Sequence, residues 1–219
     1  MGIYIEAIIL YILLFFSGSA AVFTGTSSET NELGNLAKII LYIIPSLALI
    51  WYLIYKAVKG GTFNTWVIST FKFSGKDLKV IFITLPFLLL IGSLITLAAS
   101  HINETQMQMT YHLPSTITGW IILCIISILS AYLEESYFRF YLLSKRHEMN
   151  LGTLPALFLS VALFSICHIY GGFWFFLNSV IGGTFLGFMF LQFNSLHGIA
   201  IAHALYNIFA FITIAFNQV

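Results

Sequence analysis

The residues of this chain that could do chemistry are charged groups inside long apolar stretches, where ionisable side chains are costly and mark function by default. Glu134 and Glu135 are adjacent in the run SAYLEESYFRFYLL. On a helix the two point about 100° apart, and Arg139, four residues after Glu135, lies on the same face as Glu135. We therefore expect a Glu135–Arg139 ion pair, which leaves Glu134 without a local partner and suited to general acid/base chemistry.

Two histidines and an asparagine lie in two further apolar runs. His168 is in FSICHIY, four residues after Phe164, and His203 and Asn207 are four apart in IAHALYN. A helical bundle that gathered these side chains around Glu134 would hold and deprotonate a water. Glu134 would take the proton, the histidines could bind a metal or stabilise an oxyanion, and Asn207 could orient the water or a substrate carbonyl.

Each of these groups also has a purely structural interpretation. The glutamate–arginine run could be a helix-packing ion pair, His168 a packing histidine, and His203 with Asn207 an interhelical hydrogen-bond pair. All three interpretations must hold together for the cluster to be inert. Cys167 beside His168 suggests a thiol nucleophile, but neighbouring residues of a helix diverge by about 100°, so this alternative is disfavoured.

Composition indicates a membrane protein. The chain has 219 residues, of which 59% are hydrophobic and 8% are charged, whereas a soluble domain has about 25% charged residues. Such a chain could not cover its own surface in water, and the bilayer is its natural solvent. A net charge of +1 without a basic tract indicates no nucleic-acid partner. Cys124 and Cys167 both lie in apolar runs and are expected to be core residues.

The predicted fold class is an all-α, polytopic transmembrane bundle of about seven spans, with six to eight possible. A spanning helix needs roughly 20 mostly apolar residues. The candidates by that rule are Ile3–Thr24, Leu36–Tyr55, Leu78–Ser100, Ile117–Leu143, Leu154–Tyr170, Phe173–Phe193 and Leu196–Phe216. The fourth is long and could break near its glutamates. The segment Gly60–Ser74 is expected to lie along the interface or to add a short element, and Ser74 with Asp77 predicts a helix start.

Loop charges predict the orientation. Apart from Arg139, seven Lys and Arg residues fall in the loops after the second and fourth spans, and one, Lys38, falls on the other side. The positive-inside rule then places the N-terminus in the cytoplasm. We divide the chain into N-terminal spans with a juxtamembrane segment, residues 1–75, and a core, residues 76–219, whose motifs fall within 117–216. In span six, Gly183 and Gly187 are spaced for close helix packing.

Helix rise gives the depth of each candidate residue. Counted from the cytoplasmic ends, Glu134 lies ~14 Å deep, His203 ~10 Å, Asn207 ~16 Å and His168 ~21 Å. The greater depth of His168 requires that span five tilts or begins late.

Three motifs occur in order on separate predicted helices: Glu-Glu-x-x-x-Arg at 134–139, Phe-x-x-x-His at 164–168 and His-x-x-x-Asn at 203–207. Together they resemble the CPBP family of CAAX-processing endopeptidases and bacterial abortive-infection proteins. The stretch FLGFMFLQFNSLHGIAIAHALYN is similar to the closing segment of that family. The resemblance covers roughly residues 117–216.

The resemblance implies an α-helical intramembrane peptidase that hydrolyses a peptide bond near or within the bilayer. It implies that Glu134 activates water, that Glu135 and Arg139 support it, and that His168, His203 and Asn207 complete the site. In eukaryotes and archaea the family removes the last three residues of a prenylated C-terminal tail. In bacteria it is linked to peptide maturation, bacteriocin self-immunity and cleavage of membrane-bound peptides.

Whether a metal takes part is left open by the resemblance. Glu134, His168 and His203 resemble a zinc set with one position left for water, but their spacing is not that of His-Glu-x-x-His, and metal-free catalysis is equally open. The expected partners are membrane lipids and a peptide or protein substrate, lipidated or not. The short chain with few extramembrane residues favours a bacterial plasma-membrane protein that acts on a peptide.

Two other function classes stay open beside the endopeptidase. The first is a non-catalytic protein that binds a peptide without cutting it, such as a bacteriocin immunity protein, because one fold can host binding and catalysis. The second is a proton- or ion-coupled transporter, because buried Glu and His also serve as relays. Transporters favour paired half-repeats with broken helices, and the sequence contains no convincing repeat.

Overall fold

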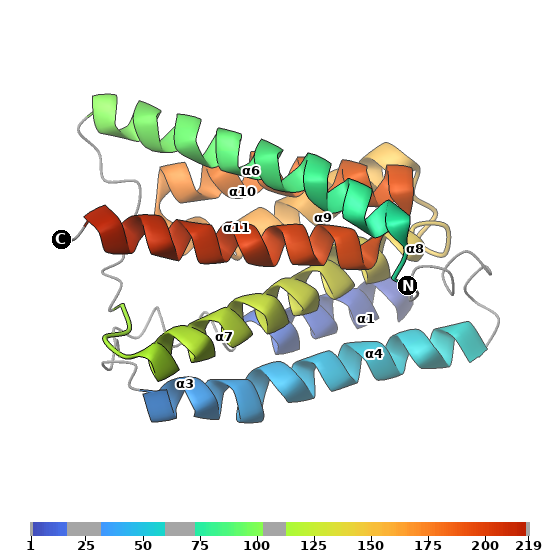
Figure 1. Cartoon of the computed structure of the whole chain (residues 1–219). Helices are drawn as coiled ribbons and strands as arrows, with labels where there is room; N and C mark the ends of the chain where they lie inside the picture. The colour runs from blue at the N-terminus through green and yellow to red at the C-terminus, as the bar shows by residue number, and fades with distance from the viewer. Residues whose placement is uncertain (1, 17–31, 60–72, 103–112, 218–219) are drawn as a thin grey trace.

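The computed structural model describes residues 2–16, 32–59, 73–102 and 113–217, and within these ranges the chain is an all-helical bundle without strands (Figure 1). The predicted interfacial segment Gly60–Ser74 lies almost entirely outside the described residues. The chain ends lie at opposite ends of the bundle (Figure 1).

The described ranges contain seven rod-like helical segments, which confirms the predicted fold class. In chain order their elements are α1 (Gly2–Tyr11) with η1 (Ile12–Phe16), α3 (Glu32–Lys38) with η2 (Ile39–Ile43) and α4 (Ile44–Lys59), α6 (Gly75–His101), α7 (Ile117–Glu135) with η3 (Ser136–Tyr141) and α8 (Leu142–Ser144), α9 (Thr153–Ile166), α10 (Phe173–Phe193) and α11 (Leu196–Asn217). Five of these rods are long and apolar enough to cross a membrane, and the first rod and α9 are shorter apolar helices. The protein is an integral membrane protein.

The long fourth rod does not break at its glutamates. The α-helical bonding of α7 ends at Glu135 and continues as the π-helix η3. Short π-helical segments occur frequently at functional sites. All residues of η3 are buried, because the segment lies among helices rather than facing lipid. A π-helical segment therefore carries Arg139 directly after the glutamates.

Helix α9 ends at Ile166, four residues before the end that hydropathy predicts, so His168 lies in the turn after the helix and not within it. The chain passes through the 3₁₀ turn η4 (Ile169–Gly171) into α10, and Gly172 has a φ of 88°, which favours glycine. Since α9 has 14 residues, it is ~21 Å long, shorter than the ~30 Å hydrocarbon core. Because α9 begins at Thr153 and not late, its start does not reduce the depth that counting gives for His168.

Two glycines of α10 allow close contact with α9, as their spacing predicts. A Cβ on Gly187 would lie 2.4 Å from Leu157 Cδ1, and one on Gly183 would lie 2.9 Å from Phe164 Cδ1 and 3.1 Å from Arg139 Nη2. The backbone of α10 thus packs directly against the motif side chains.

The predicted start of α6 is also confirmed. Ser74 caps the helix, and its N–H donates to Asp77 Oδ2 over 2.6 Å in a capping box. Asp77 is fully buried and also accepts a hydrogen bond from Ser195, just before α11. This network ties the first turns of α6 and α11 together and sets the register of the helix that carries His203. The division into residues 1–75 and 76–219 stays a prediction.

Candidate active site

Glu135 and Arg139 form the predicted ion pair. Their side chains are 0% exposed, and Arg139 Nη1 lies 3.1 Å from Glu135 Oε1. Arg139 also donates through Nη2 to the Gly183 carbonyl over 3.2 Å, and its guanidinium lies 4.2 Å from the ring centroid of Phe164. A buried charge pair is stable only when further hydrogen bonds satisfy it, and α10 supplies one of them.

The ring of His203 lies between the two glutamates. His203 Nδ1 is 2.9 Å from Glu135 Oε1, and His203 Nε2 is 3.8 Å from Glu134 Oε2. A carboxylate paired with arginine accepts hydrogen bonds, so Nδ1–H is the donor to Glu135. That bond directs Nε2 toward Glu134. Sequence periodicity pairs Glu135 with Arg139 only, and the structure adds His203 as a second partner of the same oxygen.

Glu134 is in a different environment from its neighbour. Its side chain is 22% exposed, and its Oε2 atom is buried without a hydrogen-bond partner among the described residues. The ion-pair partner of Oε2 is His203, which comes from α11 and not from the helix of Glu134 itself. Such a carboxylate oxygen has accepting capacity to spare for a water.

Phe164 and His168, the two residues of the second motif, are in direct contact. His168 Nδ1 donates to the carbonyl of Phe164 over 2.7 Å, and the two rings lie 4.5 Å apart. The Phe164 ring also lies 6.0 Å from the His203 ring, edge to face, and beneath the Arg139 guanidinium. Phe164 is 3% exposed and touches groups from all three motifs. It therefore positions the site by packing.

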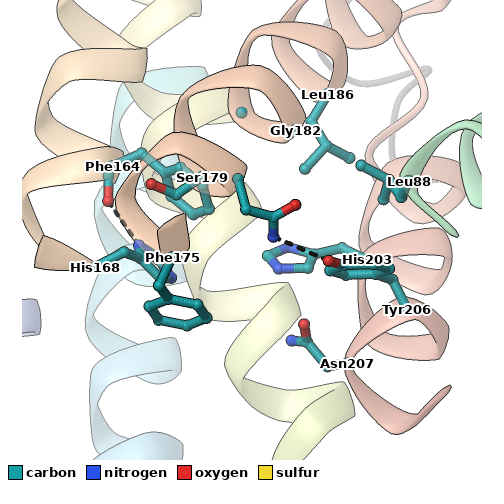
Figure 2. Close-up of a pocket in the computed structure, with 12 residues that line it drawn as sticks. Leu88, Phe164, His168, Phe175, Ser179, Gly182, Leu186, His203, Tyr206 and Asn207 are labelled. Carbon is teal, nitrogen blue, oxygen red and sulfur yellow. Dashed lines mark hydrogen bonds between the residues drawn. The ribbon is translucent and has the colours of Figure 1, made fainter. Parts of the chain in front are cut away.

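A small pocket opens beside these groups (Figure 2). His168, His203 and Asn207 all line it, so three separately predicted residues meet at one cavity. Its other walls come from α6, α9, α10 and α11. They are Leu88, Phe164, Phe175, Asn178, Ser179, Gly182, Gly183, Leu186 and Tyr206. Glu134 is not one of the lining residues, and its Oε2 atom lies 3.8 Å from Nε2 of His203, which does line the pocket.

Asn178 and Tyr206 are polar pocket residues that the sequence-based site lacks. Asn178 Nδ2 donates to the Tyr206 hydroxyl over 2.9 Å, the bond drawn to Tyr206 in Figure 2. A Cβ on Gly92 would lie 2.6 Å from that hydroxyl, so Gly92 of α6 makes room for it. Asn178 is a polar residue inside an apolar run, and the rule that marks intramembrane polar groups as functional could have found it.

The arrangement was tested for a fit to a metal. Within the described ranges no three His, Cys, Asp or Glu side chains are grouped as a metal ion requires. His203 uses Nδ1 for Glu135, and His168 uses Nδ1 for a carbonyl. These bonds leave Nε2 of both histidines free, but Glu134, His168 and His203 are not among any group of described residues that could hold a metal ion, and metal dependence stays a prediction. Cys124 and Cys167 are free thiols, and both are only partly buried, so they are not the core residues that the sequence predicts.

Comparison with protein families gives a match over the second half of the chain. Residues 114–209 match the family model described as "Type II CAAX prenyl endopeptidase Rce1-like", a stretch that contains all three motifs. Neither the curated proteins nor the solved structures contain a match. The family match agrees with the resemblance drawn from the motifs and with the meeting of their side chains in the bundle. Residues 114–209 of this membrane protein are therefore similar to the Rce1-like family of type II CAAX prenyl endopeptidases.

Proposed function

We propose that the protein is an intramembrane endopeptidase in which Glu134 activates a water to hydrolyse a peptide bond of a membrane-associated substrate. The observation that carries this proposal is the facing pair Glu134 Oε2 and His203 Nε2, 3.8 Å apart. That distance is too long for a direct hydrogen bond. A water can bridge the two atoms once the Glu134 side chain turns, because its Oε2 atom is buried in this structure. The family match supports the reaction class.

The Glu135–His203 bond determines how such a water is held. With Nδ1–H donating to Glu135, the neutral ring offers Nε2 as an acceptor. A water ~2.8 Å from each acceptor could donate one hydrogen to Glu134 and the other to His203. Its lone pair would then be free to attack a carbonyl carbon.

Hydrolysis would proceed in two steps. In the first, Glu134 takes a proton from the water as its oxygen bonds to the carbonyl carbon, and the carbonyl oxygen becomes an oxyanion. Asn207, which lines the pocket, is the side chain we assign to this oxyanion through its amide N–H. His168 lines the same pocket, and because its Nδ1–H is bonded to the Phe164 carbonyl, it can donate from Nε2 only when its ring is protonated. In the second, the C–N bond breaks and Glu134 returns its proton to the leaving amine, so that acid and amine products balance.

The substrate is a peptide or protein that meets the bundle in or at the membrane. A lipidated C-terminal tail is one candidate, and a bacterial membrane peptide is the other. Comparative peptidomics of membranes that contain the wild type or Glu134→Ala would identify the substrate, because uncut peptide accumulates only with the variant.

Substitution of Glu134 tests the catalytic assignment. Glu134→Ala and Glu134→Gln should each abolish cleavage by the purified protein in lipid vesicles while leaving it folded and inserted. Glu148→Gln, a change at an exposed turn position, is the matched control and should keep wild-type activity. Full cleavage by Glu134→Ala would overturn the proposal. A cellular phenotype that survives loss of Glu134 would instead support the non-catalytic peptide-binding role.

Metal dependence is tested separately. The geometry around His168 and His203 leads us to expect that purified wild type contains no stoichiometric zinc and keeps its activity after dialysis against a chelator. Elemental analysis of wild type and His168→Ala makes the comparison. Stoichiometric metal in the wild type that is lost in His168→Ala would assign a metal role to that histidine.

A further inference from the structure

The end of α9 needs hydrogen-bond donors for its last carbonyl groups, as every helix C-terminus does. The carbonyl of Leu163 accepts a long backbone bond of 3.4 Å from the Cys167 N–H. It accepts a second bond, of 3.1 Å, from the hydroxyl of Tyr11. The next carbonyl, that of Phe164, accepts from the His168 ring. Two neighbouring carbonyls thus each accept a hydrogen bond from a side chain, one from α1 and one from the candidate active site.

Tyr11 makes a second bond at the same place. Its hydroxyl accepts from the Cys167 thiol over 3.2 Å. One hydroxyl therefore holds the residue before Phe164 and the residue before His168. The Tyr11 ring lies 6.3 Å from the Phe138 ring, edge to face, and Phe138 in turn packs edge to face on Phe164 at 5.3 Å. The hydroxyl of Tyr11 therefore contacts the end of α9 directly, and its ring is linked to Phe164 through Phe138.

We propose that Tyr11 is a positioning residue for His168, through which the N-terminal helix α1 takes part in the site. Its hydroxyl holds the last turn of α9 so that the His168 ring keeps its bond to the Phe164 carbonyl and stays at the pocket. Tyr11 lies outside the segment 114–209 that matches the family. The catalytic part of this inference rests on the proposed endopeptidase function, and the structural part does not.

Helix α1 is held to the bundle by other bonds, so the hydroxyl of Tyr11 can be removed without releasing the helix. Tyr137 donates to the carbonyl of Ala7 over 2.7 Å, and Lys145 forms an ion pair of 3.1 Å with Glu6. Tyr4 donates to the carbonyl of Met149 near the opposite end of α9. Tyr4→Phe is therefore a matched control: it removes the same kind of bond from the same helix, far from His168.

The experiment compares Tyr11→Phe with Tyr4→Phe in a Cys124→Ser background, where Cys167 is the one thiol. Loss of one hydrogen bond at the site should lower kcat about 10-fold with KM unchanged, because His168 is misplaced but the pocket still binds substrate. The rate of Cys167 modification by a small thiol reagent should rise severalfold, because its thiol loses its partner. Tyr4→Phe should leave both quantities close to the wild type.

The outcomes separate this inference from the proposed function. Glu134→Gln should abolish cleavage without changing the rate of Cys167 modification. If Tyr11→Phe keeps the wild-type kcat, or leaves Cys167 modification unchanged, the positioning role is wrong. If the wild type cleaves no substrate, the proposed function fails, and the modification rates alone decide whether Tyr11 holds the turn. Equal effects of Tyr11→Phe and Tyr4→Phe would show general loosening of α1 and would also overturn the inference.

Discussion

The adjacent glutamates of one helix lie in different environments, because one of them is paired with an arginine and the other is not. Glu135 shares one oxygen between Arg139 and His203 and is fully buried. Glu134, one residue earlier, is partly exposed and has His203 as its ion-pair partner; in both glutamates the Oε2 atom has no hydrogen-bond partner in the described part of the chain. The same side-chain chemistry therefore serves structure at one position and, in our proposal, reaction at the other.

This difference predicts separate behaviour of the two Glu→Gln variants. Glu135→Gln leaves the buried Arg139 charge uncompensated, which costs about 3–5 kcal/mol of stability, and should lower the melting temperature and the activity together. Glu134→Gln should lower activity alone. Thermal unfolding and cleavage, measured on the same detergent-solubilised samples, test this. Unfolding of Glu134→Gln at a temperature as low as that of Glu135→Gln would contradict it.

At the scale of elements, the site depends on how closely α10 approaches α9 and η3. Gly183 is the contact point: its carbonyl accepts from Arg139, and its missing side chain leaves room for Phe164. Because Phe164 packs on His168 and His203, a displacement at Gly183 is passed directly to both histidines.

Gly183→Ala should therefore cost far more activity than Gly187→Ala. The added methyl at position 183 must push a buried aromatic ring and a paired guanidinium, and overpacking of this kind costs about 1–3 kcal/mol. At position 187 it meets the far end of Leu157, a flexible side chain. Cleavage rates and melting temperatures of the two variants make the comparison. Equal activity of both variants would show that the contact at Gly183 does not position the site.

Sequence reasoning locates elements better than the contacts between them. It predicts α10 with both ends correct and pairs Glu135 with Arg139, because hydropathy and helical spacing are local properties. It places the end of the fifth span too late, since the apolar run continues past Ile166 while the helix ends where the chain turns toward Gly172. It also misses the bond between Glu135 and His203, because periodicity within one helix does not tell which face of another helix it meets.

The whole molecule is polarised along its long axis. Within the described residues, one end of the bundle carries Lys56, Lys59, Lys76, Lys79, Lys145 and Arg146. The predicted contribution of Lys72 lies outside those residues. The N-terminus lies at this basic end and the C-terminus at the opposite one (Figure 1).

We propose that the basic end faces the cytoplasm, in accordance with the positive-inside rule. Reporter fusions at the two termini test this: a fluorescent protein should be active at the N-terminus, and a phosphatase that works only outside the cytoplasm should be active at the C-terminus. The reverse pattern would contradict the orientation. The same fusions, expressed in a bacterium and fractionated, test residence in the plasma membrane.

The short length of α9 has a consequence for the supply of water to the reaction. Irregular backbone is tolerated at membrane depth only where its polar groups are satisfied or line a hydrated cavity. In the turn after α9, the N–H groups of His168, Gly171 and Gly172 bond to the carbonyls of Ser165, His168 and Ile169 over 2.9, 3.2 and 3.1 Å. This turn borders the pocket through His168, and these bonds satisfy the N–H groups named. The proposed hydrolysis consumes one water per bond cut, and we expect each water to enter past this turn.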